Sequence, residues 1–84
     1  MVDYLTIDYK ADATLDCKGL LCPMPIVKLG KQMKTMQPGQ TLEILATDIG
    51  VESDIPAWCQ STKNEYIGMK EPKEGLYTLY IRKA

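Results

Sequence analysis

The hydrophobic positions of the chain follow two periods, one of two residues and one of three to four. Alternation with a period of two predicts strands, and these fall at residues 13–16, 41–47, 65–69 and 76–81. Spacings of three and four predict amphipathic helices with one apolar stripe. The first helix, of about three turns, has the stripe Ile26, Leu29, Met33 and Met36, and the second, over 53–64, has the stripe Ile55, Trp58, Cys59 and Thr62.

Turn and capping residues separate these elements. Residues 37–40 (QPGQ) end the first helix, and residues 71–75 (EPKEG) join the last two strands as a hairpin. Ser53 or Asp54 is expected to cap the second helix, which leaves Pro56 in its first turn. The predicted fold class is α/β (α+β), a two-layer βαβαββ sandwich. Both helices cover one face of a mixed four-stranded sheet, and the other face is open to solvent or a partner.

The composition and charge of the chain exclude several classes of function. Eighty-four residues, 45% of them hydrophobic and 25% charged, predict a single globular domain over residues 1–84. The formal charge is −1 and no basic cluster is present, so direct nucleic-acid binding is not expected. We see no signal peptide and no apolar run long enough to span a bilayer, which predicts a cytoplasmic protein without membrane contact. The chain has no histidine, which excludes imidazole-based catalysis and zinc sites that need imidazole.

Three cysteines remain as candidates for chemistry: Cys17, Cys22 and Cys59. An odd number in a reducing compartment does not fit a disulfide framework, and the spacing fits no metal site. No cofactor is expected. Cys59 falls on the apolar stripe of the second helix and is interpreted as a core residue.

The most informative segment is residues 16–25 (DCKGLLCPMP). Pro23 and Pro25 stiffen the chain, and Pro25 suits the first position of a helix, so Cys22 is expected at or just before a helix N-terminus. Unpaired amides and the helix dipole favour an anion there. The pKa of a thiol in such a position falls from about 8.5 to about 3.5–7.5. The alternative is that Cys22 is a buried, inert helix-start residue.

Neighbouring polar residues are candidates for auxiliary roles. Lys18, on the turn made by Gly19, would add a positive charge. Asp16 is interpreted as fixing the glycine turn through hydrogen bonds to its backbone amides. A carboxylate near the thiol, from Asp16 or from Asp48 at the end of the next strand, opposes thiolate formation. Leu20, Leu21 and Met24 are candidates for a docking rim, although Leu20 or Leu21 can instead fill the core.

The motif Leu15-Asp16-x-Lys18-Gly19-Leu20-x-Cys22-Pro23-x-Pro25 resembles the signature of the TusA/SirA-like sulfur-carrier family. The resemblance continues through the turn at 36–39, the helix start at 54–56, the pair at 58–59 and the closing residues 80–83. It covers residues 12–83, nearly the whole chain, and leaves residues 1–11 as an N-terminal extension.

The resemblance implies a sulfurtransferase that carries sulfur as a persulfide on Cys22. It implies a cysteine desulfurase or rhodanese-like protein as sulfur donor and a DsrE-type sulfurtransferase as acceptor. The implied destinations are tRNA thiolation, cofactor biosynthesis or sulfur oxidation; neighbouring subfamilies are linked to selenium or to transport of sulfur compounds. A carrier that must dock such partners is expected to be a monomer.

Cys17 is a departure from the family pattern and leaves two interpretations open. It is either a resolving thiol that acts on Cys22, or a strand-end residue packed under the loop. Two other functions are therefore weighed against the carrier: a non-catalytic binding or regulatory module, and a Cys17/Cys22 redox switch.

Overall fold

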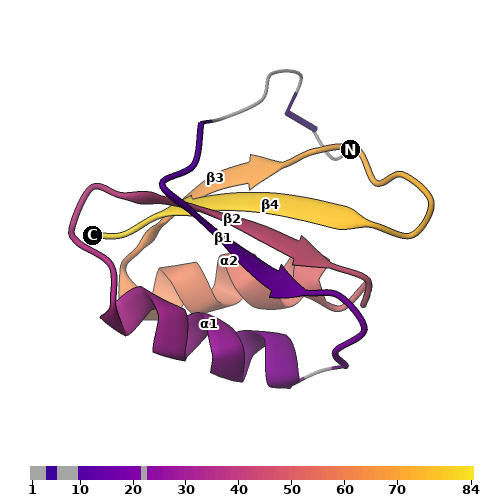
Figure 1. Cartoon of the computed structure of the whole chain (residues 1–84), viewed down its shortest axis with the longest axis horizontal. Coiled ribbons are helices and arrows are strands. Elements are labelled where there is room, and N and C mark those ends of the chain that lie inside the picture. Colours follow the sequence, from indigo (N-terminus) through magenta and orange to yellow (C-terminus); the bar gives the residue numbers. More distant parts are fainter. Residues whose placement is uncertain (1–3, 6–9, 22) are drawn as a thin grey trace.

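The computed structural model describes residues 4–5, 10–21 and 23–84. Six elements follow one another in the predicted order: β1 (Ala13–Cys17), α1 (Met24–Lys34), β2 (Thr41–Ala46), α2 (Val51–Thr62), β3 (Glu65–Met69) and β4 (Tyr77–Arg82). The strand order across the sheet is β1-β2-β4-β3. β1 and β2 are parallel, and β4 is antiparallel to both of its neighbours, β2 and β3. Both helices lie against the same face of the sheet (Figure 1), which confirms the predicted two-layer sandwich.

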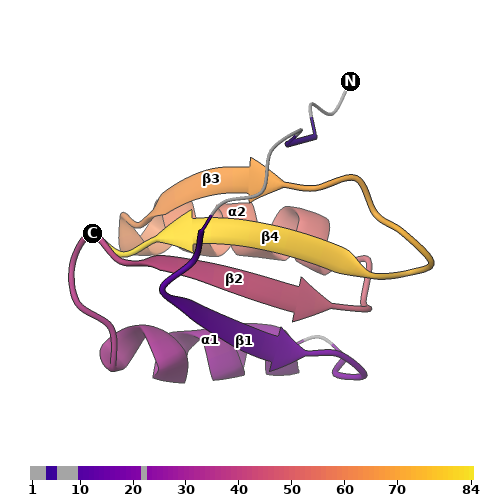
Figure 2. The ribbon, with the colours of Figure 1, turned by 45° about the horizontal axis from the view of Figure 1, so that its top comes forward.

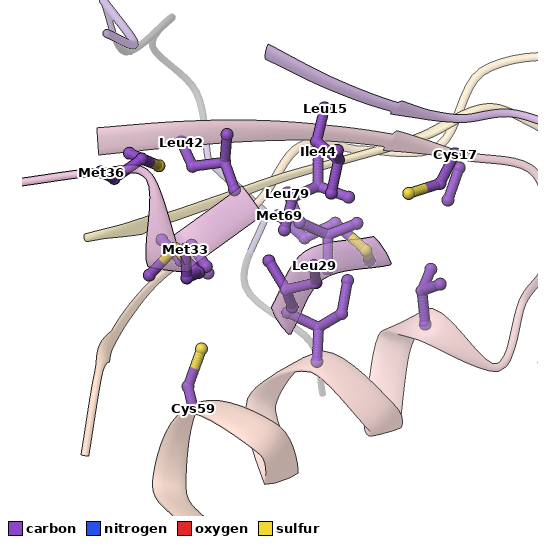
Figure 3. Packing of buried hydrophobic residues seen from close by; sticks show 14 residues of the cluster. Leu15, Cys17, Leu29, Met33, Met36, Leu42, Ile44, Cys59, Met69 and Leu79 are labelled. Atoms are coloured by element: carbon purple, nitrogen blue, oxygen red, sulfur yellow. The ribbon is translucent and has the colours of Figure 1, made fainter. Parts of the chain in front are cut away.

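The core lies between the sheet and the two helices. Alternate residues of the strands point towards it because side chains of a strand alternate between the two faces. Leu42, Ile44 and Ala46 of β2 are fully buried there, as the pattern predicted. Figure 3 shows leucine, isoleucine and methionine side chains from both layers meeting in this space. The sheet is therefore fixed against the helices by its central strand, which positions the loops at its ends.

The N-terminus of α2 differs from the sequence prediction. The helix begins at Val51, with Gly50 as the N-cap and without a side-chain capping bond, so neither Ser53 nor Asp54 caps it. The reason is a preceding turn in which the Gly50 N–H donates to Asp48 Oδ1 at 3.3 Å. Pro56 is consequently the sixth residue of the helix rather than a member of its first turn.

The buried stripe of α2 also differs in part from the predicted one. It consists of Val51, Ile55 and Cys59, spaced by four residues, with Trp58 partly buried beside it. The prediction that Thr62 belongs to this stripe is wrong: Thr62 is exposed, and its hydroxyl donates to the Trp58 carbonyl at 2.7 Å.

The sheet face away from the helices is more covered than predicted. A row of paired residues crosses it from β1 to β3: Thr14, Glu43, Tyr80 and Gly68. The Tyr80 hydroxyl donates to Glu43 Oε2 at 2.8 Å, and only 1% of Tyr80 is exposed. Gly68 lacks a side chain, and Leu5 occupies the vacant space, with its N–H donating to the Met69 carbonyl at 2.8 Å. Figure 2 shows this N-terminal segment beside β3, at the edge of the sheet.

Candidate functional site: the β1–α1 connection

The connection between β1 and α1 begins with a turn fixed by Asp16. The Lys18 N–H donates to Asp16 Oδ1 at 2.9 Å, which confirms the expected bond from this carboxylate to the glycine turn. The Leu20 N–H then donates to the Cys17 carbonyl at 3.1 Å. Gly19 has a φ of +80°, a conformation that other residues rarely adopt. The chain can therefore reverse direction here only with glycine or at the cost of strain.

A threonine from the neighbouring strand ties this turn to the rest of the sheet. The Gly19 N–H donates to Thr47 Oγ1 at 2.9 Å. Because β1 and β2 are parallel neighbours, their C-terminal ends meet at one edge, where both βα connections begin. Sequence reasoning missed the role of Thr47; its position as the last residue of the predicted strand 41–47 was the available signal.

Cys22, the predicted sulfur-carrying residue, lies outside the described residues. On either side of it in the sequence, the Met24 N–H donates to the Leu21 carbonyl at 2.9 Å. Pro23 is the N-cap of α1 and Pro25 occupies the second helical position, where it is buried. The predicted helix is present and begins at Met24, so Pro25 occupies its second position rather than the expected first. The placement of Cys22 at the helix N-terminus stays a prediction.

The backbone amides at the start of α1 are less available than predicted. Pro23 and Pro25 have no N–H, and the Met24 N–H is bonded to Leu21. The Ile26 and Val27 N–H groups both donate to the Pro23 carbonyl at 3.1 Å. The expectation of unpaired amides at this helix end is therefore wrong for the amides of residues 23–27. The helix dipole still favours an anion at this end of α1.

Two lysines lie at or near this connection, Lys18 in the turn and Lys28 on α1. Lys18 lies on the exposed turn, as predicted. Lys28, which sequence reasoning missed, reaches back from α1, and its Nζ donates to the backbone carbonyl of Asp16. Helical side chains tilt towards the helix N-terminus, so a lysine in the second turn of the predicted helix was the signal. The first turn of α1 contains no acidic residue.

Cys17 and Cys59 are both core residues. Their exposed fractions are 0% and 1%, and both point into the space between sheet and helices (Figure 3). Burial raises the pKa of the Cys17 thiol; Lys28 opposes this shift and Asp16 adds to it. Burial alone raises the pKa of Cys59 to about 11. The buried position of Cys17 fits the interpretation that it is a strand-end residue packed under the loop. A resolving thiol would instead have to be accessible to the thiol with which it reacts. For Cys59, burial confirms the expected core position.

Exposed apolar side chains border the connection. Leu21, Met24 and Val27 are 72%, 49% and 44% exposed, and Ile49 of the adjacent β2–α2 loop is 65% exposed. We call these four residues the apolar rim. Leu20 turns inward and packs against the core. Of the three rim candidates named from the sequence, Leu21 and Met24 are therefore exposed beside position 22.

Among the described residues, no cluster of three or more metal-ligating side chains is found. In the same part of the chain, no helix is long and apolar enough to cross a membrane. The described residues of the candidate site therefore comprise the turn at Lys18 and Gly19, its tethers Asp16 and Thr47, Lys28 and the apolar rim.

A model of the family described as "Sulfurtransferase TusA" matches residues 13–83. The chain belongs to the TusA family. The matched range starts at the first residue of β1 and includes the β1–α1 connection.

Individual TusA-family proteins show the same similarity. A putative sulfur carrier protein of Halobacterium salinarum is 39% identical over 80 residues, which cover 95% of this chain and 99% of that protein. The sulfur carrier protein TusA of Pseudomonas entomophila is 40% identical over 72 residues, 86% of this chain and 89% of that protein. The putative sulfur carrier protein YrkF of Bacillus subtilis is 52% identical over 75 residues, or 89% of this chain, but the match spans only 40% of YrkF.

A solved structure supports the fold independently. The crystal structure of a SirA-like protein from Desulfitobacterium hafniense superposes with a TM-score of 0.72. The superposition covers 83% of this chain and 95% of that one, at 17% sequence identity. At this identity the match shows a shared fold, the two-layer sandwich of the TusA family.

Proposed function

We propose that the protein carries sulfur as a persulfide on Cys22 and passes it to an acceptor protein. The observation that supports this assignment is the burial of the other two thiols, because Cys17 and Cys59 are 0% and 1% exposed. Burial also raises their pKa values, which keeps both thiols protonated near neutral pH. A sulfur carrier needs an accessible thiolate. Cys22 is the remaining cysteine of the chain.

The transfer needs no cofactor and no base other than solvent. The Cys22 thiolate attacks the terminal sulfur of a donor persulfide, R–S–SH, and forms a new S–S bond. The S–S bond of the donor breaks, and its electron pair leaves with the donor thiolate, R–S⁻. Cys22 then holds the persulfide Cys–S–SH, whose terminal sulfur an acceptor thiolate removes by the same reaction. The protein supplies the nucleophile and its surroundings, so its part in catalysis is modest.

The apolar rim fits the partner proteins that such a relay requires. Exposed large apolar side chains gathered at one place mark a protein interaction site. Here Leu21, Met24 and Val27 come from the connection and the start of α1, and Ile49 from the loop beside it. We propose that a cysteine desulfurase or rhodanese-like donor and a DsrE-type acceptor contact this rim in turn. The reaction then belongs to the cytoplasm, where thiols stay reduced, and serves tRNA thiolation, cofactor biosynthesis or sulfur oxidation.

Intact mass spectrometry tests the assignment. The wild type and the variants Cys17→Ser, Cys22→Ser and Cys59→Ser are incubated with a persulfide donor, and the mass of each intact protein is then measured. We expect the wild type, Cys17→Ser and Cys59→Ser to gain the mass of one sulfur atom and Cys22→Ser to gain none. A sulfur adduct on folded Cys22→Ser would show that another thiol is the carrier. A folded wild type that gains no sulfur would favour the non-catalytic binding module.

A further inference from the structure

β3 forms one edge of the sheet, and the N-terminal segment pairs with the end of this edge. The strand order β1-β2-β4-β3 gives β3 a single partner strand, β4. The Leu5 N–H donates to the Met69 carbonyl at 2.8 Å, and Leu5 forms a parallel bridge with Lys70, directly after β3. Backbone groups along an open strand edge pair readily with another extended chain. Residues 4–5 therefore contact the end of β3 as an added strand would (Figure 2).

Gly68 provides the space that the Leu5 side chain occupies. A Cβ atom at Gly68 would lie 2.8 Å from Leu5 Cδ2 and 2.9 Å from Leu5 Cγ, closer than side chains pack. Gly68 is paired with Tyr80 of β4 on the face that no helix covers, and Tyr80 is nevertheless only 1% exposed. The contact thus combines a backbone hydrogen bond with a fitted side chain. Sheet edges bind extended peptides through these same two features.

The paired segment is separate from the domain that the family shares. The family match begins at residue 13, the first residue of β1, and Leu5 precedes it. Among the described residues, the hydrophobic core and the side chains packed against it include neither Tyr4 nor Leu5. The segment can therefore leave the edge of β3 without opening the core. Every copy of the chain carries both this segment and the edge that it fits, so a second copy offers a matching partner.

We propose that the edge of β3 at Gly68 and Met69 is a binding site for the N-terminal segment of a second copy of this chain. In the monomer the chain's own residues 4–5 fill the site, close the edge and keep the chain monomeric. When they are released, the same two contacts hold the segment of the second copy: the hydrogen bond to the Met69 carbonyl and the leucine side chain against Gly68. This inference concerns association of the chain and does not depend on the sulfur-carrier function.

A synthetic peptide with the sequence of residues 1–11 tests the site. It is added to isotope-labelled full-length wild type, Leu5→Asp, Leu5→Ala and Tyr4→Asp, and the backbone amide signals of residues 68–70 are followed by NMR. Leu5→Asp places a charge against Gly68 and so empties the site, whereas Leu5→Ala removes most of the side chain. Tyr4→Asp is the matched control, because Tyr4 is adjacent in the sequence and its side chain is exposed. A second peptide that carries the Leu5→Asp substitution controls for non-specific binding.

We expect the unsubstituted peptide to bind Leu5→Asp about three- to ten-fold more tightly than the wild type, because the tethered segment of the wild type competes at a millimolar effective concentration. Leu5→Ala should give an intermediate affinity, and Tyr4→Asp should behave like the wild type. The substituted peptide should shift the signals in none of the proteins. Equal binding of both peptides to Leu5→Asp, or no binding to it at millimolar peptide, would overturn the site. Equal affinity for the wild type and Leu5→Asp would show that residues 4–5 do not close the edge. The amide spectrum itself reports whether each variant is folded.

Unlabelled full-length wild type tests the second copy as the source of the segment. Added to labelled Leu5→Asp, it should shift the same signals as the peptide, but at higher concentrations, because its own segment is engaged within the chain. Sedimentation equilibrium should show each protein alone as a monomer and their mixture as partly associated. A peptide that binds while full-length wild type leaves both the signals and the mass unchanged would confine the contact to a single chain and overturn the proposal.

Discussion

The molecule contains two βα units that share one architecture and treat their helix starts in opposite ways. In both units a strand ends at the same edge of the sheet, and a short loop leads to a helix on the same face (Figure 1). α2 has Glu52 and Asp54 in its first turn, and the Asp48 side chain accepts a hydrogen bond just before it. α1 has no acidic residue in its first turn, and prolines stand at its N-cap and second position.

The two helix starts differ in the charge that they present to the helix dipole. The positive end of a helix dipole is stabilised by negative charge, and α2 supplies that charge from its own sequence. α1 leaves its positive end without a carboxylate, and Lys28 adds a further charge at the adjoining connection. The acidic residues therefore stabilise the start of α2, whereas the first turn of α1 has no such residue.

The buried thiol of Cys59 in the second unit should make the stability of the protein depend on alkaline pH, and this is the largest effect we expect. Burial raises the pKa of Cys59 from its ordinary value of 9.0 to about 11. Above pH 9 the thiol ionises in the unfolded chain but not yet in the folded one, so stability is complete below that pH and is lost as the pH rises to about 11. The free energy of unfolding should fall by up to about 3 kcal/mol over this window, since one pKa unit corresponds to about 1.4 kcal/mol.

Urea denaturation across the alkaline range measures this loss. Lysines and tyrosines also titrate there, so the quantity of interest is the difference between the wild type and Cys59→Ala. That difference should shrink as the pH rises through the window, whereas Cys22→Ser should follow the wild type. Parallel curves for wild type and Cys59→Ala would show that the buried thiol does not control alkaline stability.

The prolines of the two helices should have opposite effects on stability. Pro56 is the sixth residue of α2, where a residue with an N–H would donate to the carbonyl four positions earlier. Pro56→Ala should therefore stabilise the protein by about 1–2 kcal/mol, because a proline inside a helix costs about 3 kcal/mol and part of this is offset by a stiffer unfolded chain. Pro25→Ala should destabilise it by about 1 kcal/mol, since Pro25 fits the first turn and is buried. The urea denaturation midpoints of both variants, compared with that of the wild type, test this prediction. Shifts of the same sign would show that the two prolines do not have opposite effects on stability.

Local signals in the sequence were sufficient for the order of the elements and for the helix start after position 22. Strand alternation also contained the orientation of Cys17, because Leu15 and Cys17 are two residues apart and must share a face. The start of α2 was misplaced because the preference of Ser53 and Asp54 for caps is weaker than the turn formed by Asp48 and Gly50.

Other features depend on contacts between distant segments. The bond between Gly19 and Thr47 joins residues 28 positions apart. The cover of the second sheet face depends on Leu5 meeting Gly68, which requires the register of all four strands. Lys28 reaches the Asp16 carbonyl only once α1 lies against the sheet. These contacts follow from tertiary packing. Sequence position can mark Thr47 and Lys28 as candidates, but it does not identify the partners that they contact.

Exchanging the charges at the two helix starts gives the smallest expected effect and the most direct test of the contrast. Met24→Glu gives α1 an acidic residue in its first turn, as α2 has, and Glu52→Gln removes one of the two acidic residues from the first turn of α2. Met24→Glu should stabilise the fold and Glu52→Gln should destabilise it, each by about 0.3–1 kcal/mol, which is the usual worth of a charge at a helix end.

The reactivity of Cys22 should change only with the substitution in the first unit. Met24→Glu should slow alkylation of Cys22 by iodoacetate, which is negative, more than by iodoacetamide, which is neutral, and Glu52→Gln should leave both rates unchanged. The controls are Met24→Gln, which changes the shape without adding charge, and repetition at high salt, which should reduce every difference. If Met24→Gln slowed iodoacetate as much as Met24→Glu does, the apolar side chain rather than the unneutralised helix end would determine how Cys22 reacts.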